Sequence, residues 1–128
     1  MTAWKDATIF RKLTLGTEYD PALKAITAQR RVTGPARDLQ NEFWQQAEAL
    51  VGLLDAYILF RDEQYWTAFR LVWDFVWKHN INHAVGEWYA LLERDGTVKW
   101  DYLGHAWKNN YHTVRSMIKC IRRLKQVE

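Results

Sequence analysis

The residues best suited to acid–base chemistry lie near the start of the segment that we expect to form the last helix. His112 and Arg115 are three positions apart, so both side chains should project from one face of that helix. The unperturbed pKa of histidine, ~6.5, suits proton transfer near neutral pH. A lone histidine more often caps a helix or forms a local hydrogen bond, and the residues alone favour this structural role for His112.

Two glutamates stand next to apolar residues. Glu48 lies beside the apolar stripe of an expected helix, and Glu87 directly precedes Trp88 at the start of an expected hairpin. A carboxylate in such a place must be paired or must face a polar cavity, because unpaired burial is costly. From the residues alone, both glutamates are expected at the surface.

Six of the eight tryptophans fall into two groups. Trp66, Trp73 and Trp77 have the spacing of a helix core, which favours packing. Trp44, Trp88 and Trp107 stand at helix starts or next to polar residues. They could form walls for a sugar, whose C–H faces pack on aromatic rings while its hydroxyls bind polar groups. Composition does not decide between the two roles.

Other common kinds of chemistry have no signature here. The sequence has no glycine-rich phosphate loop, no nucleophile elbow and no zinc motif. His79, His83 and His105 lack metal-ligand spacing, so we expect them to be structural or exposed, and we expect no metal and no cofactor. Cys120 is the single cysteine and is expected in the core.

Two strongly periodic segments are expected to form an antiparallel pair of helices, at 39–60 and 62–80. Their apolar residues recur at steps of three and four: Phe43, Ala47, Leu50, Leu54, Tyr57 and Ile58 in the first, and Tyr65, Trp66, Phe69, Val72, Trp73, Val76 and Trp77 in the second. Asp38 and Asp62 are candidate N-caps. The dipeptide Arg61–Asp62 leaves room only for a tight connection.

The rest of the chain is expected to add a β-hairpin and further helices. Asp95–Gly96 is a strong turn signal between strands expected at 88–92 and 98–100. A last helix is predicted from residues with helical spacing: Val114, Met117, Ile118, Ile121 and Leu124. Near the N-terminus, one helix is expected from Trp4 to Gly16 and another from Asp20–Pro21 to Gly34–Pro35.

Length and charge limit the number of domains and the classes of partner that the chain is expected to have. The 128 residues fit one domain, which we place at 1–128, and the longest apolar run is too short and too often interrupted to cross a membrane. With no leader pattern, the chain is expected to be cytoplasmic. Five basic residues and one acid follow from Arg115 onward. They suit the negative end of a helix dipole, and the net charge of +3 does not predict nucleic-acid binding.

Four motifs, taken together, resemble one known family. They are Phe-Trp-Gln-Gln-Ala-Glu-Ala at 43–49, Gly-Glu-Trp-Tyr at 86–89 followed by Arg-Asp-Gly at 94–96, Trp-Lys at 107–108, and Tyr-His-Thr-Val-Arg at 111–115. In order and spacing they resemble the C-terminal third of the N-acylglucosamine 2-epimerase superfamily, which includes cellobiose 2-epimerases and mannose isomerases. The likeness covers about 38–124, and residues 1–37 remain unassigned.

The resemblance implies an all-α fold of helical hairpins that form part of an (α/α)6 barrel around a sugar pocket, with the β-hairpin inserted. Family members open a sugar to its aldehyde and move a proton at C2 with two histidines. One of them corresponds to His112, and Glu48 would support a histidine or orient hydroxyls. The implied substrate contacts are Trp107, Trp44, Glu87, Trp88 and Arg115, and Arg115 is expected above all to anchor the last helix.

The departures from the family leave several hypotheses. Members are considerably longer, and their second histidine lies in an upstream His-x-x-Glu segment, whereas no histidine precedes His79 here. The leading hypothesis is a C-terminal piece of a sugar epimerase or isomerase, completed by self-association or by a complementary chain. The alternative is a non-catalytic sugar-binding or protein-interaction module, and a nucleic-acid role for the basic end is weaker.

Overall fold

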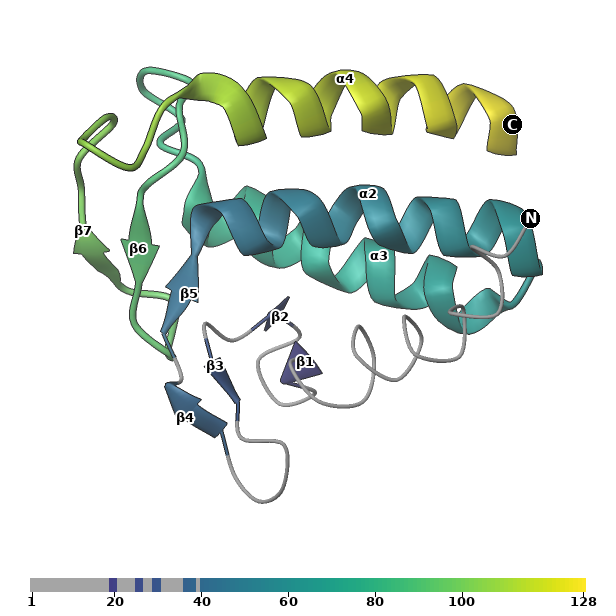
Figure 1. Cartoon of the computed structure of the whole chain (residues 1–128), viewed down its shortest axis with the longest axis horizontal. Helices are drawn as coiled ribbons and strands as arrows, with labels where there is room; N and C mark the ends of the chain where they lie inside the picture. Colours follow the sequence, from purple (N-terminus) through teal and green to yellow (C-terminus); the bar gives the residue numbers. More distant parts are fainter. Residues whose placement is uncertain (1–18, 21–24, 27–28, 31–35, 39) are drawn as a thin grey trace.

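The computed structural model of the chain describes residues 19–20, 25–26, 29–30, 36–38 and 40–128. The described residues form three long helices beside a small sheet (Figure 1). The helices are α2 (Phe43–Phe60), α3 (Glu63–Phe75), which continues into the π-helical turn η3 (Val76–Asn80), and α4 (Asn110–Val127). The sheet consists of β5 (Asn41–Glu42), β6 (Leu91–Leu92) and β7 (Val98–Trp100). No helix among the described residues is long and apolar enough to cross a membrane.

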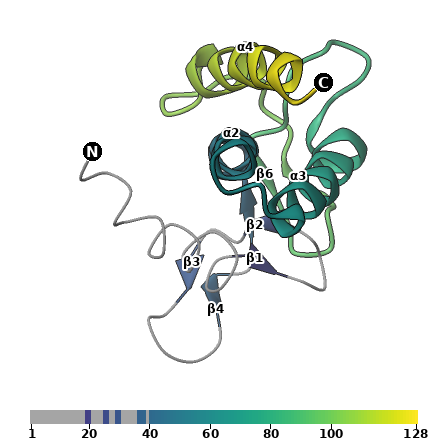
Figure 2. The same cartoon turned by 90° about the vertical axis from the view of Figure 1, so that its right-hand side faces the viewer.

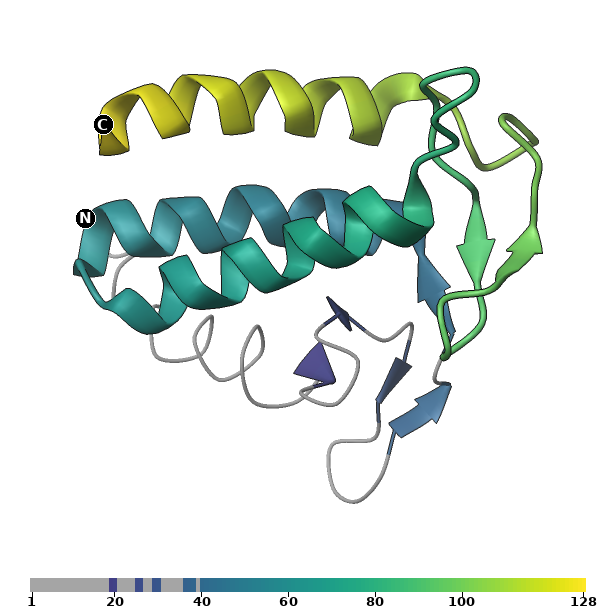
Figure 3. The same ribbon diagram turned by 180° about the vertical axis from the view of Figure 1, so that it is seen from behind.

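The predicted antiparallel hairpin of α2 and α3 is confirmed (Figures 1 and 3). Arg61 ends α2 in the left-handed conformation, with φ of 52°, and its N–H bonds the carbonyl of Tyr57 at 2.9 Å. Asp62 begins α3 as predicted, because its side chain accepts from the N–H of Gln64 at 3.0 Å. Two residues therefore suffice to reverse the chain.

The start of α2 differs from the prediction. The helix begins at Phe43, and Asp38 is not its cap, because Asp38 belongs to β4 (Ala36–Asp38) and β5 comes between. The N–H of Phe43 donates to the carbonyl of Ala90 at 3.2 Å. A carbonyl at the edge of the sheet thus partners the first helical N–H, which a capping side chain would otherwise satisfy.

The predicted β-hairpin is confirmed, and it gains a third strand. The sheet order is β5-β6-β7 with antiparallel pairing throughout. Gly96 has a φ of +87°, which only glycine adopts readily, and Asp95 accepts from the N–H of Thr97 at 2.9 Å. Trp88 lies outside the strand and forms only an isolated bridge with Ile81. The third strand escaped prediction because two residues carry no periodicity.

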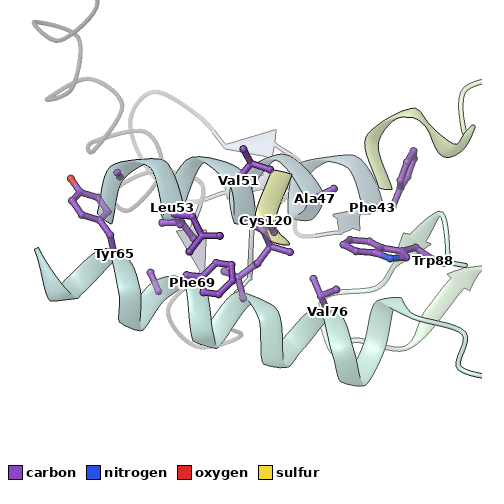
Figure 4. Packing of buried hydrophobic residues seen from close by; sticks show 14 residues of the cluster. Phe43, Ala47, Val51, Leu53, Tyr65, Phe69, Val76, Trp88 and Cys120 are labelled. Carbon is purple, nitrogen blue, oxygen red and sulfur yellow. The ribbon is translucent and has the colours of Figure 1, made fainter. Parts of the chain in front are cut away.

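The core lies between α2 and its two neighbours, α3 on one side and α4 on the other (Figures 2 and 4). Its fully buried members include Ala47, Leu50, Leu53, Leu54 and Val72. On α4 the buried residues are small: Thr113, Ser116 and Cys120. The burial of Cys120 predicted from the sequence is confirmed.

The predicted apolar face of the last helix is only partly buried. Met117 and Leu124 pack against the core, whereas Val114, Ile118 and Ile121 are 51%, 45% and 55% exposed. The reason is that α4 touches α2 through its row of small residues. The larger apolar row therefore faces away from the rest of the described chain.

The tryptophans of α3 are less buried than their spacing predicts. Trp66 and Trp73 are half-buried against the core, but Trp77 is 52% exposed. Val76 and Asn80 fill the core side of η3, so Trp77 turns outward. It contacts the rings of Trp73 and His83 at centroid distances of 5.9 and 4.6 Å.

The predicted helix from Asp20–Pro21 to Gly34–Pro35 is wrong. The segment contains β2 (Ala25–Ile26) and β3 (Gln29–Arg30), which pair antiparallel with β1 (Tyr19–Asp20) and β4 respectively. Asp20 is extended, as the steric effect of a following proline favours. The helix predicted from Trp4 to Gly16 lies outside the described residues.

The buried thiol gives a test of the packing of α4 on α2. Burial raises the pKa of Cys120 to about 11, so the thiol is neutral near pH 7 and shielded from reagents. We expect a thiol-reactive chromogenic disulfide to modify Cys120 only as fast as the chain unfolds, and immediately in denaturant. Rapid modification of the native chain would contradict the packing of α4.

Candidate functional site

The site is built around Glu48 of α2, which binds two residues of α4. The Nδ1 atom of His112 lies 2.9 Å from Glu48 Oε1, and one terminal nitrogen of Arg115 donates to both carboxylate oxygens at 2.8 Å. Each of the three side chains is 33% exposed. The helices α2 and α4 run side by side and both begin at the end that carries the sheet (Figure 1). Sequence spacing placed His112 and Arg115 on one face, and the fold brings Glu48 to that face.

The electrostatics of this cluster fix the tautomer of His112. Burial alone would raise the pKa of Glu48, but hydrogen bonds from His112 and Arg115 outweigh it, and the pKa is lowered. The hydrogen bond to Glu48 in turn raises the pKa of Arg115. An ionised carboxylate only accepts hydrogen bonds, so Nδ1 of His112 carries the proton and neutral His112 keeps a basic lone pair on Nε2.

A hollow of about 650 Å³ adjoins His112. Its walls come from the start of α2, from the sheet, and from the loop 101–109 that precedes α4. The lining residues are Gln40, Glu42, Phe43, Trp44, Ala90, Leu91, Lys99, Trp100, His105, Trp107 and His112. A second hollow of about 660 Å³ lies along α3, but its lining includes neither His112 nor Glu48. The first hollow thus combines aromatic walls with histidine side chains, whereas the lining of the second contains no histidine.

Trp44 and Trp107 both line the hollow, as their predicted role requires. Trp44 is 39% exposed, its ring lies 6.0 Å from that of His112, and its indole N–H bonds Glu42. Trp107 is 88% exposed, so almost all of its ring is free to meet a ligand. An exposed ring next to one held by a hydrogen bond can accept the apolar face of a sugar.

Trp88 and Glu87 do not line the hollow. Trp88 is 4% exposed, and Figure 4 shows it among the side chains of the core. Glu87 accepts from the backbone N–H of Trp88 at 2.7 Å and pairs with Lys108 at 3.3 Å. The contacts of both residues are therefore with the core and with Lys108, and their predicted sugar contact stays a prediction. Arg115 binds Glu48, in agreement with its expected anchoring of the last helix.

Sequence reasoning missed Lys108, which holds the loop before α4. Its side chain is fully buried, and its Nζ donates to the carbonyl of Leu103 at 2.7 Å and lies 5.1 Å from the ring centre of Phe43. Two backbone hydrogen bonds of 3.1 Å join Lys108 to His105. A lysine is rarely fully buried unless it is paired, so sequence alone gave no signal of this role.

Some of the basic residues of α4 form ion pairs with acidic residues of α2. Arg123 pairs with Asp55 of α2 through two nitrogens, and Arg115 pairs with Glu48. Two of the five basic residues thus join α4 to α2, and Lys125 lies in the last turn of α4, where it suits the helix dipole. The described residues contain no group of His, Cys, Asp or Glu side chains that could hold a metal ion.

Comparison with known proteins now assigns the family. The N-acylglucosamine 2-epimerase (GlcNAc 2-epimerase) family matches residues 3–116. The chain belongs to this family. The match extends through most of the first 37 residues, for which the motifs gave no likeness.

The similar relatives within the N-acylglucosamine 2-epimerase family are named for activities on sugars. A D-mannose isomerase from Marinomonas mediterranea is 30% identical over 91 residues, covering 71% of this chain and 23% of the relative. A cellobiose 2-epimerase from Ruminococcus albus is 34% identical over 89 residues, covering 67% and 23%. The chain therefore spans about a quarter of the length of these relatives.

Solved structures agree with this assignment. Cellobiose 2-epimerase from Spirochaeta thermophila matches with a TM-score of 0.78 and 28% identity, over 93% of this chain and 29% of that one. A D-mannose isomerase structure matches with a TM-score of 0.76 and 25% identity, over 92% and 29%. The described fold is thus that of a segment of these epimerase-family proteins.

Replacing Glu48 tests the link between α2 and α4. We expect Glu48→Gln to lower the free energy of unfolding at pH 7 by roughly 1 kcal/mol, because charge-assisted bonds to His112 and Arg115 are lost. The lowered pKa of Glu48 means that its contribution is complete above the unfolded value of ~4.3 and is lost as pH falls through the lower folded value. The measurement is urea unfolding of both proteins from pH 3 to pH 7. A stability difference that grows on acidification would contradict the assignment.

Removing the buried lysine should destabilise the loop and the core together. We expect Lys108→Ala to cost about 2–4 kcal/mol, because it leaves Glu87 without its cation and opens a cavity beside Phe43. Lys78→Ala is the matched control, since that lysine pairs with Asp74 at the surface and should cost less than about 0.5 kcal/mol. Urea unfolding measures both, and equal costs would refute the anchoring role of Lys108.

Proposed function

We propose that this chain forms part of a sugar 2-epimerase or aldose–ketose isomerase in which His112 transfers a proton at C2. The single observation that carries the proposal is the hydrogen bond between His112 Nδ1 and ionised Glu48, beside a hollow with tryptophan walls. The named activities of the relatives, D-mannose isomerase and cellobiose 2-epimerase, support a sugar as substrate.

The proposed chemistry begins from the open-chain aldose. Its C2 proton is acidic because the electrons of the C2–H bond can form a C1=C2 double bond while the carbonyl electrons move to O1. His112 takes this proton on Nε2, and Glu48 stabilises the resulting imidazolium without taking the proton itself. Return of a proton to the other face of C2 gives the epimer. Return of the proton to C1, with movement of the O2 hydroxyl proton to O1, gives the ketose.

The proposal gives each remaining site residue a distinct task. Trp44 and Trp107 bind the apolar face of the sugar, and Arg115 fixes the carboxylate that orients His112. Transfer of a proton between an imidazole and a carbonyl compound needs no cofactor. Inversion at C2 needs an acid on the opposite face, and we propose that the family's second histidine arrives from outside this chain.

We further propose that the chain is one domain, 1–128, which forms part of an (α/α)6 barrel. One observation supports a completing partner, either a second copy or a complementary chain: α4 exposes the apolar residues Val114, Ile118 and Ile121. In an isolated monomer this apolar row would meet water.

A second candidate function is a sugar-binding module without catalysis. The specific observation in its favour is the 88% exposure of Trp107, which offers a binding face independent of His112. This alternative predicts sugar binding without any exchange of hydrogen at C2.

Hydrogen exchange at C2 separates the two functions. We expect the folded chain to exchange the C2 proton of mannose or cellobiose in heavy water, and His112→Gln to slow this exchange about 10²–10⁴-fold, because a general base is lost. Proton NMR of the sugar measures the rate. His83→Gln is the control, since His83 bonds the carbonyl of Trp77 outside the hollow.

Two outcomes would count against catalysis by His112. Sugar binding with no exchange by the folded wild-type chain would favour the binding module. Exchange that survives in His112→Gln would move the base to another residue.

A further inference from the structure

His105 lines the same hollow as His112, although sequence spacing suggested only a structural role. It lies in the loop before α4, where its backbone forms both hydrogen bonds with the buried Lys108. Its ring stands edge-on to Trp100 at 6.0 Å and 87°, and Trp100 is another wall of the hollow. The imidazole is therefore held at this wall by contacts on both its backbone and its ring.

The hydrogen bonds of His105 determine which nitrogen carries its proton. The backbone N–H of Trp107 donates to His105 Nδ1 at 3.2 Å. A backbone N–H can only donate, so Nδ1 must be the acceptor, and in neutral imidazole the proton is then on Nε2. Among the described residues, no side chain or carbonyl accepts a hydrogen bond from that Nε2–H.

The two histidines of the hollow are thus held in opposite tautomers. Glu48 holds the proton of His112 on Nδ1 and leaves a lone pair on Nε2, whereas Trp107 occupies Nδ1 of His105 and leaves a proton on Nε2. One wall residue can accept a hydrogen bond or proton and the other can donate one. A ligand with hydroxyl groups, each both donor and acceptor, matches such a pair.

We propose that His105 is a substrate-binding residue that donates a hydrogen bond from Nε2 to an oxygen of the sugar held beside His112. The proposal rests on the proposed function for the class of ligand, and it adds a residue and a direction for the hydrogen bond. His105 takes no proton from the sugar, since its Nε2 already carries one.

Substitution by asparagine separates this contact from a role in shaping the loop. In His105→Asn, the side-chain oxygen stands near the place of Nδ1 and can still accept from Trp107 N–H, as asparagine does in local turns. The Nε2–H donor is lost. We expect the affinity for mannose or cellobiose, measured by tryptophan fluorescence titration, to fall about 3- to 10-fold with unchanged thermal unfolding.

Three further measurements complete the test. His83→Asn, outside the hollow, should bind sugar as the wild type does. His105→Ala, which also removes the acceptor of Trp107 N–H, should bind at least as weakly as His105→Asn. Nitrogen-15 NMR of the imidazoles should report an Nε2–H tautomer for His105 and an Nδ1–H tautomer for His112.

The outcomes distinguish this inference from the proposed function. Wild-type affinity in His105→Asn, or an Nδ1–H tautomer for His105, would overturn the inference while leaving catalysis by His112 intact. Wild-type binding without C2 exchange would refute the proposed catalysis, and a loss of affinity in His105→Asn would still support the donor role. No sugar binding by the wild-type chain would overturn both.

Discussion

The contact between α2 and α4 through charged side chains is the constraint on which the site depends. Glu48 binds His112 and Arg115, and two turns further along the same helices Asp55 binds Arg123. Between these contacts α4 presents small residues to α2, so the helices approach closely with little large apolar area between them. The ion pairs therefore set the position of α4 along α2, and with it the distance from Glu48 to the imidazole.

The same contact serves stability and chemistry at once. Arg115 offsets the cost of partly burying Glu48, and the pKa of Glu48 falls as a result. An ionised Glu48 can hold the Nδ1–H of His112, which leaves Nε2 as a base. A neutral residue at position 48 would keep the helices together less well and would leave the tautomer of His112 undetermined.

The loop before α4 supplies the other half of the hollow through a buried cation. Lys108 anchors the loop beneath Phe43 and Glu87, and the adjacent Trp107 and nearby His105 then face the hollow. Glu87 and Trp88, expected as sugar contacts, also support this loop: Glu87 pairs with Lys108, and Trp88 packs in the core. The exposed row of Val114, Ile118 and Ile121 lies on the side of α4 that faces away from α2, where the proposed completing chain would pack.

The sequence by itself determined the elements whose signals are local. Helical spacing predicted α2, α3 and α4, Asp95–Gly96 predicted the β-hairpin, and four motifs in register predicted the family. Only the tertiary structure decided which helix faces are buried, because burial depends on the neighbouring helix: Trp77 and Ile118 have core spacing but no core beside them. It also decided the site partners. Glu48 and His112 are 64 positions apart, and no local sequence pattern predicts a hydrogen bond between side chains so distant in the chain.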